Sequence, residues 1–107
     1  MVDAKLTVIA RVRANEGMEE KVKQECLALV DPSRKEQGCL KYELYQSTND
    51  PTLFIFYENW ESREHLERHL ETPHSLLFDE RTAGLLAEPE EITFCDIISA
   101  PHLNICQ

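Results

Sequence analysis

Three of the four histidines and the only tryptophan of this 107-residue chain lie close together in the segment NWESREHLERHLETPH, residues 59–74. An imidazole titrates near neutral pH, so a histidine can accept a proton from a phenol or an enol. An indole ring can form a flat pocket wall against an aromatic ligand. The segment could therefore be a metal site, an acid–base site or an ordinary amphipathic helix.

Metal binding would need a further ligand beside His65 and His69, which are four residues apart and share one face of a predicted helix. The glutamate that follows the first histidine of an HExxH zinc motif is absent, and no third ligand has a suitable place in the sequence. His65 is therefore interpreted as a surface residue, and no metal ion is expected. His74 follows Pro73 at a helix start, where it could cap the helix or line the mouth of a pocket.

His69 borders the apolar stripe that Leu66 and Leu70 form on the predicted helix. This position suits a pocket acid or base, and it also suits a core-edge histidine that bonds a backbone carbonyl. Trp60 ends a predicted strand on the same face as Phe56, so it is either a large core residue or a wall for a flat ligand. Either interpretation places both rings close to the same helix.

Glu58 alternates with the apolar residues of that strand, where a carboxylate is costly unless it is paired. It could bond His69 and orient it as a base, or it could pair with a cation across the sheet or the dimer interface, the candidates being Arg11, Arg13 and Lys41. Tyr42 could hydrogen-bond a ligand oxygen, or it could be a half-buried strand residue. Phe78, on a later predicted helix, would help to keep such a pocket dry.

Charge and composition exclude several classes of partner. The net charge of −9 repels phosphate backbones and anionic lipid, so neither nucleic acid nor a membrane is an expected partner. No apolar run approaches the ~20 residues of a membrane span. The N-terminus lacks the pattern of a signal peptide, so a cytoplasmic location is expected. The four cysteines form no CxxC pair and are expected to be reduced, mostly small core residues: Cys26, Cys39, Cys95 and Cys106.

Hydrophobic periodicity divides the chain, a single domain over residues 1–107, into strands and helices. Alternating residues predict strands over 4–14, 39–47, 52–60 and 92–100, the middle two joined as a hairpin by the NDP turn. A helix is predicted from residue 18, interrupted at Asp31-Pro32 with Asp31 as a cap, and closed by Gly38 as the C-cap. Ser62 should cap a helix to about Glu71, and Pro73 should start another that includes Leu85 and Leu86.

This order predicts an α+β protein with the ferredoxin-like split βαβ fold, in which helices cover one face of a four-stranded antiparallel sheet. The strand over 52–60 carries apolar residues on both faces. The face without helices therefore needs a partner, and the simplest is a second copy that completes a dimeric α/β barrel.

The segment GCLKYELYQSTNDPTLFIFYENWESREHLERHLETPH, residues 38–74, resembles the signature region of the antibiotic biosynthesis monooxygenase family. The matching pieces are Gly38-Cys39-Leu40, Tyr42-Glu43-Leu44, Tyr57-Glu58-x-Trp60, His69 and Pro73-His74. The flanking segments are similar as well, so the likeness extends over nearly the whole chain. It implies a small dimeric α+β barrel with a pocket histidine at His69.

The resemblance implies several activities. The first hypothesis is a cofactor-independent monooxygenase that oxidises a phenol, quinol or enol with dioxygen, using His69 as the base and Tyr42 as a positioning donor. Phe56, Glu58, His74 and Phe78 would then line the site for a small aromatic or quinone-like molecule. Haem degradation is disfavoured because the first strand lacks the asparagine of haem degraders. The alternatives are a non-enzymatic ligand-binding or stress-associated dimer and an isomerase of a small keto compound.

Overall fold

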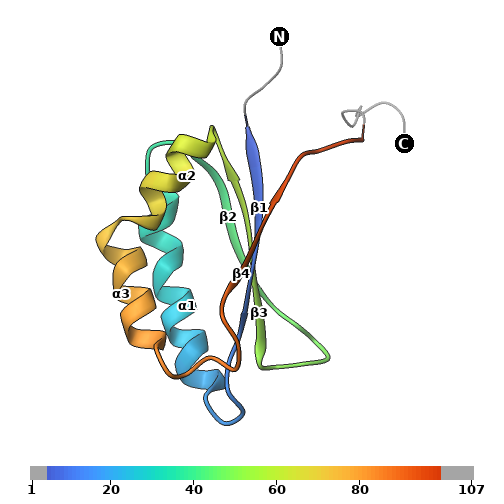
Figure 1. Ribbon diagram of the computed structural model, residues 1–107, viewed down its shortest axis with the longest axis vertical. Helices are drawn as coiled ribbons and strands as arrows, with labels where there is room; N and C mark the ends of the chain where they lie inside the picture. Colours follow the sequence, from blue (N-terminus) through green and yellow to red (C-terminus); the bar gives the residue numbers. More distant parts are fainter. Residues whose placement is uncertain (1–4, 100–107) are drawn as a thin grey trace.

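The computed structural model describes residues 5–99, which form one sheet and three helices. The elements follow in the order β1 (Leu6–Arg13), α1 (Glu19–Arg34), β2 (Cys39–Gln46), β3 (Leu53–Trp60), α2 (Arg63–Leu70), α3 (Pro73–Thr82) and β4 (Glu91–Cys95). All three helices lie on one side of the sheet (Figure 1). The predicted α+β fold with helices on one face is confirmed.

The strands are antiparallel and lie in the order β2-β3-β1-β4. The two central strands are β1 and β3, and the register of their pairing sets Val8 opposite Glu58 and Ala10 opposite Phe56. This order is the one expected for a split βαβ unit, because each half of the chain contributes one central and one edge strand.

Alternation along β1 and β3 directs one set of side chains toward the helices. These buried side chains form the core together with residues of β2 and of all three helices. The core residues are Val8, Ala10, Val12, Ala14, Val22, Cys26, Leu29, Tyr42, Phe54, Phe56, Trp60, Leu66 and Phe78. Val8, Ala10 and Val12 are the residues that the first strand contributes to this core. The inward position between Phe56 and Trp60 is taken by a charged residue, Glu58.

The two later helices begin where the sequence predicts. The Ser62 hydroxyl accepts a hydrogen bond from the backbone N–H of His65, and the Thr72 hydroxyl accepts one from Ser75. Pro73 occupies the first turn of α3, where its missing N–H costs nothing. These caps fix the short junction between α2 and α3, and this junction carries the candidate site.

The first helix differs from the prediction at its C-terminal end. α1 runs through Pro32 without interruption, so the predicted restart with Asp31 as a cap is wrong. Pro32 lies in the last turn, and the carbonyl that loses its helical partner belongs to exposed Ala28 and can face water. The C-cap is Lys35 and not Gly38, and Gly38 lies beyond the helix with a φ of +89°.

Three smaller differences concern the later elements. α3 ends at Thr82, so the predicted extension over Leu85 and Leu86 is wrong, and Gly84 follows with a φ of +81°. β4 ends at Cys95, short of the predicted residue 100, and the predicted tail over 101–107, with Cys106, lies outside the described residues. Leu40 is 46% exposed because a register shift between Cys39 and Lys41 displaces it from the inward face of β2.

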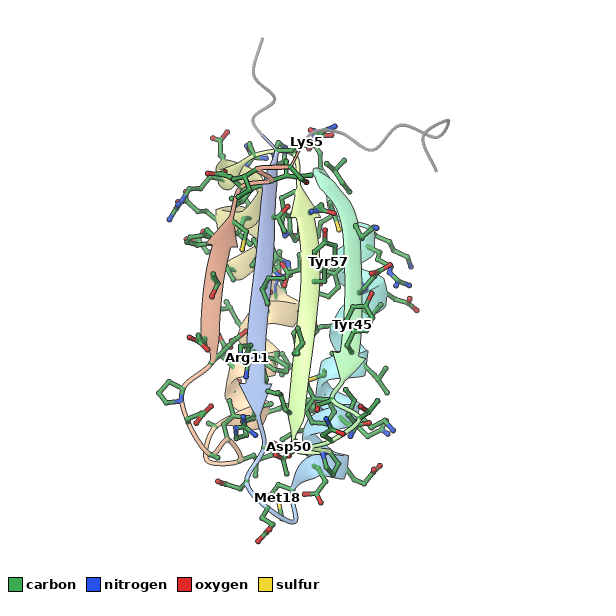
Figure 2. All side chains as sticks on the ribbon, turned by 90° about the vertical axis from the view of Figure 1, so that its right-hand side faces the viewer. Lys5, Arg11, Met18, Tyr45, Asp50 and Tyr57 are labelled. Atoms are coloured by element: carbon green, nitrogen blue, oxygen red, sulfur yellow. The ribbon has the colours of Figure 1, made fainter. Side chains whose placement is uncertain are left out.

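The face of the sheet opposite the helices is open, and Figure 2 views it directly. Tyr45 on β2, Tyr57 on β3 and Arg11 on β1 belong to this face (Figure 2). Ile9 pairs with Tyr57 and Ile55 pairs with Arg11 on this outward face, and both isoleucines are only partly buried in the single chain. Within residues 5–99, none of the helices has the length and apolar composition that crossing a membrane requires.

Candidate active site

His69 and His74, from two different helices, meet at one carboxylate oxygen of Glu36. His69 Nδ1 lies 2.7 Å from Glu36 Oε2, and His74 Nε2 lies 2.6 Å from the same oxygen. The three side chains are largely withdrawn from water, with exposed fractions of 5% for His69, 13% for Glu36 and 23% for His74. Because a carboxylate accepts, each imidazole donates an N–H to this oxygen.

Local structure brings these three residues together from distant parts of the chain. Glu36 lies just after the last turn of α1, His69 in the last turn of α2, and His74 in the first turn of α3. The Thr72 cap supports the junction, since its hydroxyl donates to the His69 carbonyl at 2.7 Å. Sequence analysis missed Glu36, which is separated from His69 by 33 positions. The one available signal was its place two residues before the Gly38-Cys39-Leu40 motif.

The hydrogen bond to Glu36 fixes the tautomer of His69. With Nδ1 protonated, the lone pair of the neutral ring lies on Nε2, which makes no hydrogen bond to any residue in the described range. Burial lowers the pKa of His69, and the Glu36 carboxylate partly opposes this effect. A neutral imidazole held by a carboxylate at one nitrogen can accept a proton at the other.

His69 forms part of the wall of a cavity of about 230 Å³ that lies between the sheet and the helices. Its lining residues are Val8, Ala10, Leu29, Tyr42, Glu58, Leu66, His69, Leu70, Ser75, Phe78, Asp79, Glu90 and Ile92. The volume is below the roughly 300–1,000 Å³ of pockets for drug-sized ligands, which suits a molecule of one or two rings. Of the residues that the sequence singled out, the cavity brings together Tyr42, Glu58, His69 and Phe78.

Trp60 and Phe56 are fully buried and do not line this cavity. The indole of Trp60 packs against His69 with ring centroids 4.8 Å apart, and Phe56 packs between the rings of Tyr42 and Phe78. Both residues therefore support the cavity wall from behind. His74 contacts Glu36 and lines a separate small hollow beside α1.

Glu58 has neither of the partners that the sequence suggested. Its Oε1 accepts a hydrogen bond from Trp60 Nε1 at 2.9 Å, and the residue that orients His69 is Glu36. The suggested cations have other contacts: Arg11 pairs with Glu91, Arg13 with Asp50 and Glu88, and Lys41 lies over the ring of Tyr57. Those positions lie on the outward face of the sheet, whereas Glu58 points inward.

Burial of Glu58, which is 4% exposed, raises its pKa from 4.5 to about 7. The pKa of Glu58 is higher in the folded state than in the unfolded state. The free energy of unfolding is therefore highest below pH 4.5 and falls as the pH rises through 7, where the folded protein must bury the charge. Glu58→Gln keeps the bond from Trp60 and removes this titration. At pH 8 the variant should be more stable than the wild type by on the order of 2 kcal/mol, and at pH 4 the two should be equal.

Urea unfolding at a series of pH values measures this difference. The matched control is Glu64→Gln, which removes a carboxylate that is 75% exposed on α2. A Glu58→Gln protein whose stability falls between pH 5 and 8 as steeply as that of the wild type would contradict the prediction.

Three other side chains that the sequence singled out are held in their neutral forms. Burial raises the pKa of Tyr42 far above its ordinary value, so its hydroxyl is a hydrogen-bond donor and not a base. Burial likewise raises the pKa of Cys26 to about 12 and that of Cys39 to about 11. Neither thiol is a nucleophile at neutral pH. Cys26, Cys39 and Cys95 are free thiols in the described chain.

The Glu36–His69–His74 cluster is also the set of donors best suited to a metal ion among residues 5–99. Its three ligand atoms lie within 4.8 Å of one another, and two imidazoles with one carboxylate suit Zn²⁺ or Fe²⁺. The sequence considered His65 and His69 as the ligand pair, and His65 takes no part in the cluster. The convergence of Glu36 and His74 on His69 was not predicted. The two short hydrogen bonds to Glu36 account for the convergence of these atoms without an ion.

The chain is similar to known proteins over most of its length. A family model described as antibiotic biosynthesis monooxygenase matches residues 5–81. A protein of Synechocystis, "Uncharacterized protein sll1783", is 36% identical over 76% of this chain, which spans only 58% of that protein's length. The Escherichia coli protein named "Probable quinol monooxygenase YgiN" is 34% identical over 78% of this chain and 89% of its own length. The crystal structure of PA3566 from Pseudomonas aeruginosa superposes with a TM-score of 0.86 at 37% identity, covering 92% of this chain and 99% of that one.

Proposed function

Because this chain belongs to the antibiotic biosynthesis monooxygenase family, we propose that it is a cofactor-independent monooxygenase that oxidises a small phenol, quinol or enol with dioxygen. The observation that carries the proposal is the 2.7 Å contact between His69 Nδ1 and Glu36. It leaves Nε2 of this cavity-lining residue without a hydrogen-bond partner among residues 5–99. A similar relative that carries the name of a quinol monooxygenase supports the same class of substrate.

The reaction begins with proton transfer. His69 Nε2 takes the hydroxyl proton of the substrate, and the imidazolium that forms is stabilised by Glu36. The anion is electron-rich at a ring carbon, which transfers electrons to dioxygen and forms a carbon–oxygen bond. The imidazolium returns its proton to the peroxide. Cleavage of the oxygen–oxygen bond, with loss of hydrogen from that carbon, then gives a carbonyl and water. The substrate supplies all the electrons, so no outside reductant is needed.

Apolar groups around the cavity serve this chemistry by excluding water. Val8, Leu66 and Phe78 are buried lining residues, and a dry environment protects an anion and a peroxide from side reactions. Tyr42 also lines the cavity, and its neutral hydroxyl is the group proposed to donate a hydrogen bond to a substrate oxygen.

Oxygen uptake with a panel of phenols and quinols tests the proposal. A substrate should consume dioxygen faster than it does by autoxidation without protein. Its product should gain one oxygen atom and lose two hydrogens, and the new atom should be labelled when ¹⁸O₂ is supplied. If no compound reacts faster than its autoxidation, the proposal fails, and a ligand-binding role without chemistry takes its place.

The open face of the sheet further supports a homodimer. Tyr57 is partly exposed there and Tyr45 is 52% exposed (Figure 2). Ile9 and Ile55 are partly exposed at outward positions of the two central strands. A second copy packed on this face would cover all four residues.

Ile55→Arg is therefore expected to convert a dimer to a monomer, since it would bury an unpaired charge in the interface. Light scattering after gel filtration should give the mass of two chains for the wild type and of one for the variant. Leu76→Arg, at a site that is 55% exposed on α3, is the control and should stay dimeric. A wild-type protein with the mass of one chain would overturn the dimer.

A further inference from the structure

The cavity wall has an unbalanced set of polar groups. Three carboxyl residues line it, Glu58 from β3, Asp79 from α3 and Glu90 from the segment before β4, and its lining includes neither lysine nor arginine. His69 adds the unprotonated Nε2. The ionised carboxylates and the unprotonated nitrogen of the neutral imidazole are all hydrogen-bond acceptors.

Glu58 is buried and Glu90 is partly buried, and neither carboxyl has a cationic partner among residues 5–99. Glu58 accepts one hydrogen bond through Oε1, and within residues 5–99 no group bonds Oε2. Glu90 makes no hydrogen bond or ion pair in the same part of the chain. Burial raises the pKa of each to about 7. Buried carboxylates without partners are costly, so a ligand that brings donors would satisfy them.

A second observation points to a ligand at the same place. Ser75, on the first turn of α3, is 7% exposed and lines the cavity, yet its hydroxyl oxygen has no hydrogen-bond partner. Buried polar atoms in folded proteins are normally hydrogen-bonded, so an unpartnered hydroxyl at a cavity wall indicates a group that a ligand or water satisfies.

From these contacts we propose that the cavity selects the uncharged, hydroxylated form of an aromatic diol over its oxidised dione and over anions, with Glu58 and Glu90 determining this specificity. The inference rests on the proposed function and narrows its substrate to the reduced member of a quinol–quinone pair. A quinol offers two O–H donors, one for His69 Nε2 and one for a carboxylate. A quinone offers only acceptors, whose lone pairs would face those of the carboxylates.

This selectivity has a consequence for turnover. A carboxylate forms a strong, charge-assisted hydrogen bond with a hydroxyl donor, and it repels a carbonyl oxygen. Oxidation of the bound diol to the dione would therefore weaken binding. Tyr42 and Ser75 can donate to a carbonyl, but as neutral hydroxyls they form weaker bonds than the charged groups do. The oxidised product should therefore dissociate from the cavity more readily than the substrate does.

Anaerobic calorimetry at pH 8 tests the selectivity in the absence of any oxygen chemistry. The ligands are 2,3-dimethyl-1,4-dihydroxynaphthalene and 2,3-dimethyl-1,4-naphthoquinone, whose methyl groups block reaction with thiols, and 1-naphthoate as the anion. The diol should bind ~10-fold or more tightly than the dione, and naphthoate should bind most weakly. Glu58→Gln and Glu90→Gln each replace an acceptor oxygen by an amide donor of the same shape, and each should reduce the ratio several-fold. Glu80→Gln, which is exposed on α3, should leave the ratio unchanged.

The outcomes separate this inference from the proposed function. Equal binding of diol and dione, tighter binding of the dione, or no binding of either would overturn the selectivity. A ratio that persists in both cavity variants would overturn the roles of Glu58 and Glu90. Oxygen uptake without a binding preference defeats the inference alone, and a binding preference without oxygen uptake defeats the monooxygenase proposal alone.

Discussion

Replacing His69 by alanine is expected to lower the rate of oxygen uptake by about 10²–10⁴-fold, the usual contribution of a general base. The imidazole combines an available lone pair with a carboxylate that stabilises its protonated form. Tyr42 is neutral and Glu58 is half protonated near pH 7, so neither matches it as a base. Measurement of kcat and KM with the best quinol of the panel gives the size of the effect.

The control for this prediction lies one turn earlier on the same helix. His65 bonds the Ser62 hydroxyl and lies outside the cavity, so His65→Ala should retain activity. Glu36→Gln should have an intermediate effect, because the ring of His69 stays in place but loses the charge that stabilises its protonated form. As a positioning residue, Glu36 should shift the acidic limb of the pH–rate profile, which a purely structural role would not do. Unchanged turnover in His69→Ala would remove the base from the mechanism.

Replacing Gly38 by alanine is expected to destabilise the fold by about 3 kcal/mol or more. Gly38 has a φ of +89°, a conformation that costs a residue with a Cβ about 1–2 kcal/mol. A Cβ there would also lie 2.2 Å from Cδ2 and 2.3 Å from Cγ of His65, and 2.8 Å from its Cβ. His65 is held by Ser62 on a capped helix, so the ring cannot yield without disturbing the start of α2.

Gly17 separates the two contributions. It has nearly the same φ, +92°, but a Cβ there would meet nothing within 4 Å. Gly17→Ala should therefore show the backbone cost alone, about 1–2 kcal/mol. Denaturant unfolding of both variants measures the difference between them. If both variants lose the same free energy of unfolding, His65 can move away from the new Cβ at no cost, and the predicted clash is refuted.

The sequence predicts those parts of this fold that depend on local patterns. Alternation along β1 and β3, the hydroxyl cap at Ser62 and the proline at the start of α3 are each determined by neighbouring residues. Pro32 misled the prediction because a proline in the last turn of a helix removes a single hydrogen bond, and packing of α1 outweighs that loss. The end of α3 was misplaced because two leucines beyond Gly84 continue the apolar pattern without continuing the helix.

The candidate site was only half predictable. His69 could be identified from its place beside the apolar stripe, but its carboxylate partner comes from the segment that follows α1, and no periodicity connects the two. Glu58 was recognised as an unusual inward carboxylate, yet its partner is Trp60, two residues away on the same face of the same strand. Which of several nearby groups a buried side chain bonds depends on rotamers and packing, and these follow from the assembled tertiary structure.

The packing of Trp60 against His69 gives this molecule an optical property of its own. The chain contains a single tryptophan, so all indole fluorescence comes from one fully buried ring that lies 4.8 Å, centroid to centroid, from the imidazole and donates its N–H to Glu58. Protonation of His69 or Glu58, or a ligand bound in the cavity beside them, changes the electric field at the Trp60 indole. Protonation and ligand binding at the site can thus be followed by intrinsic tryptophan fluorescence, without an attached dye.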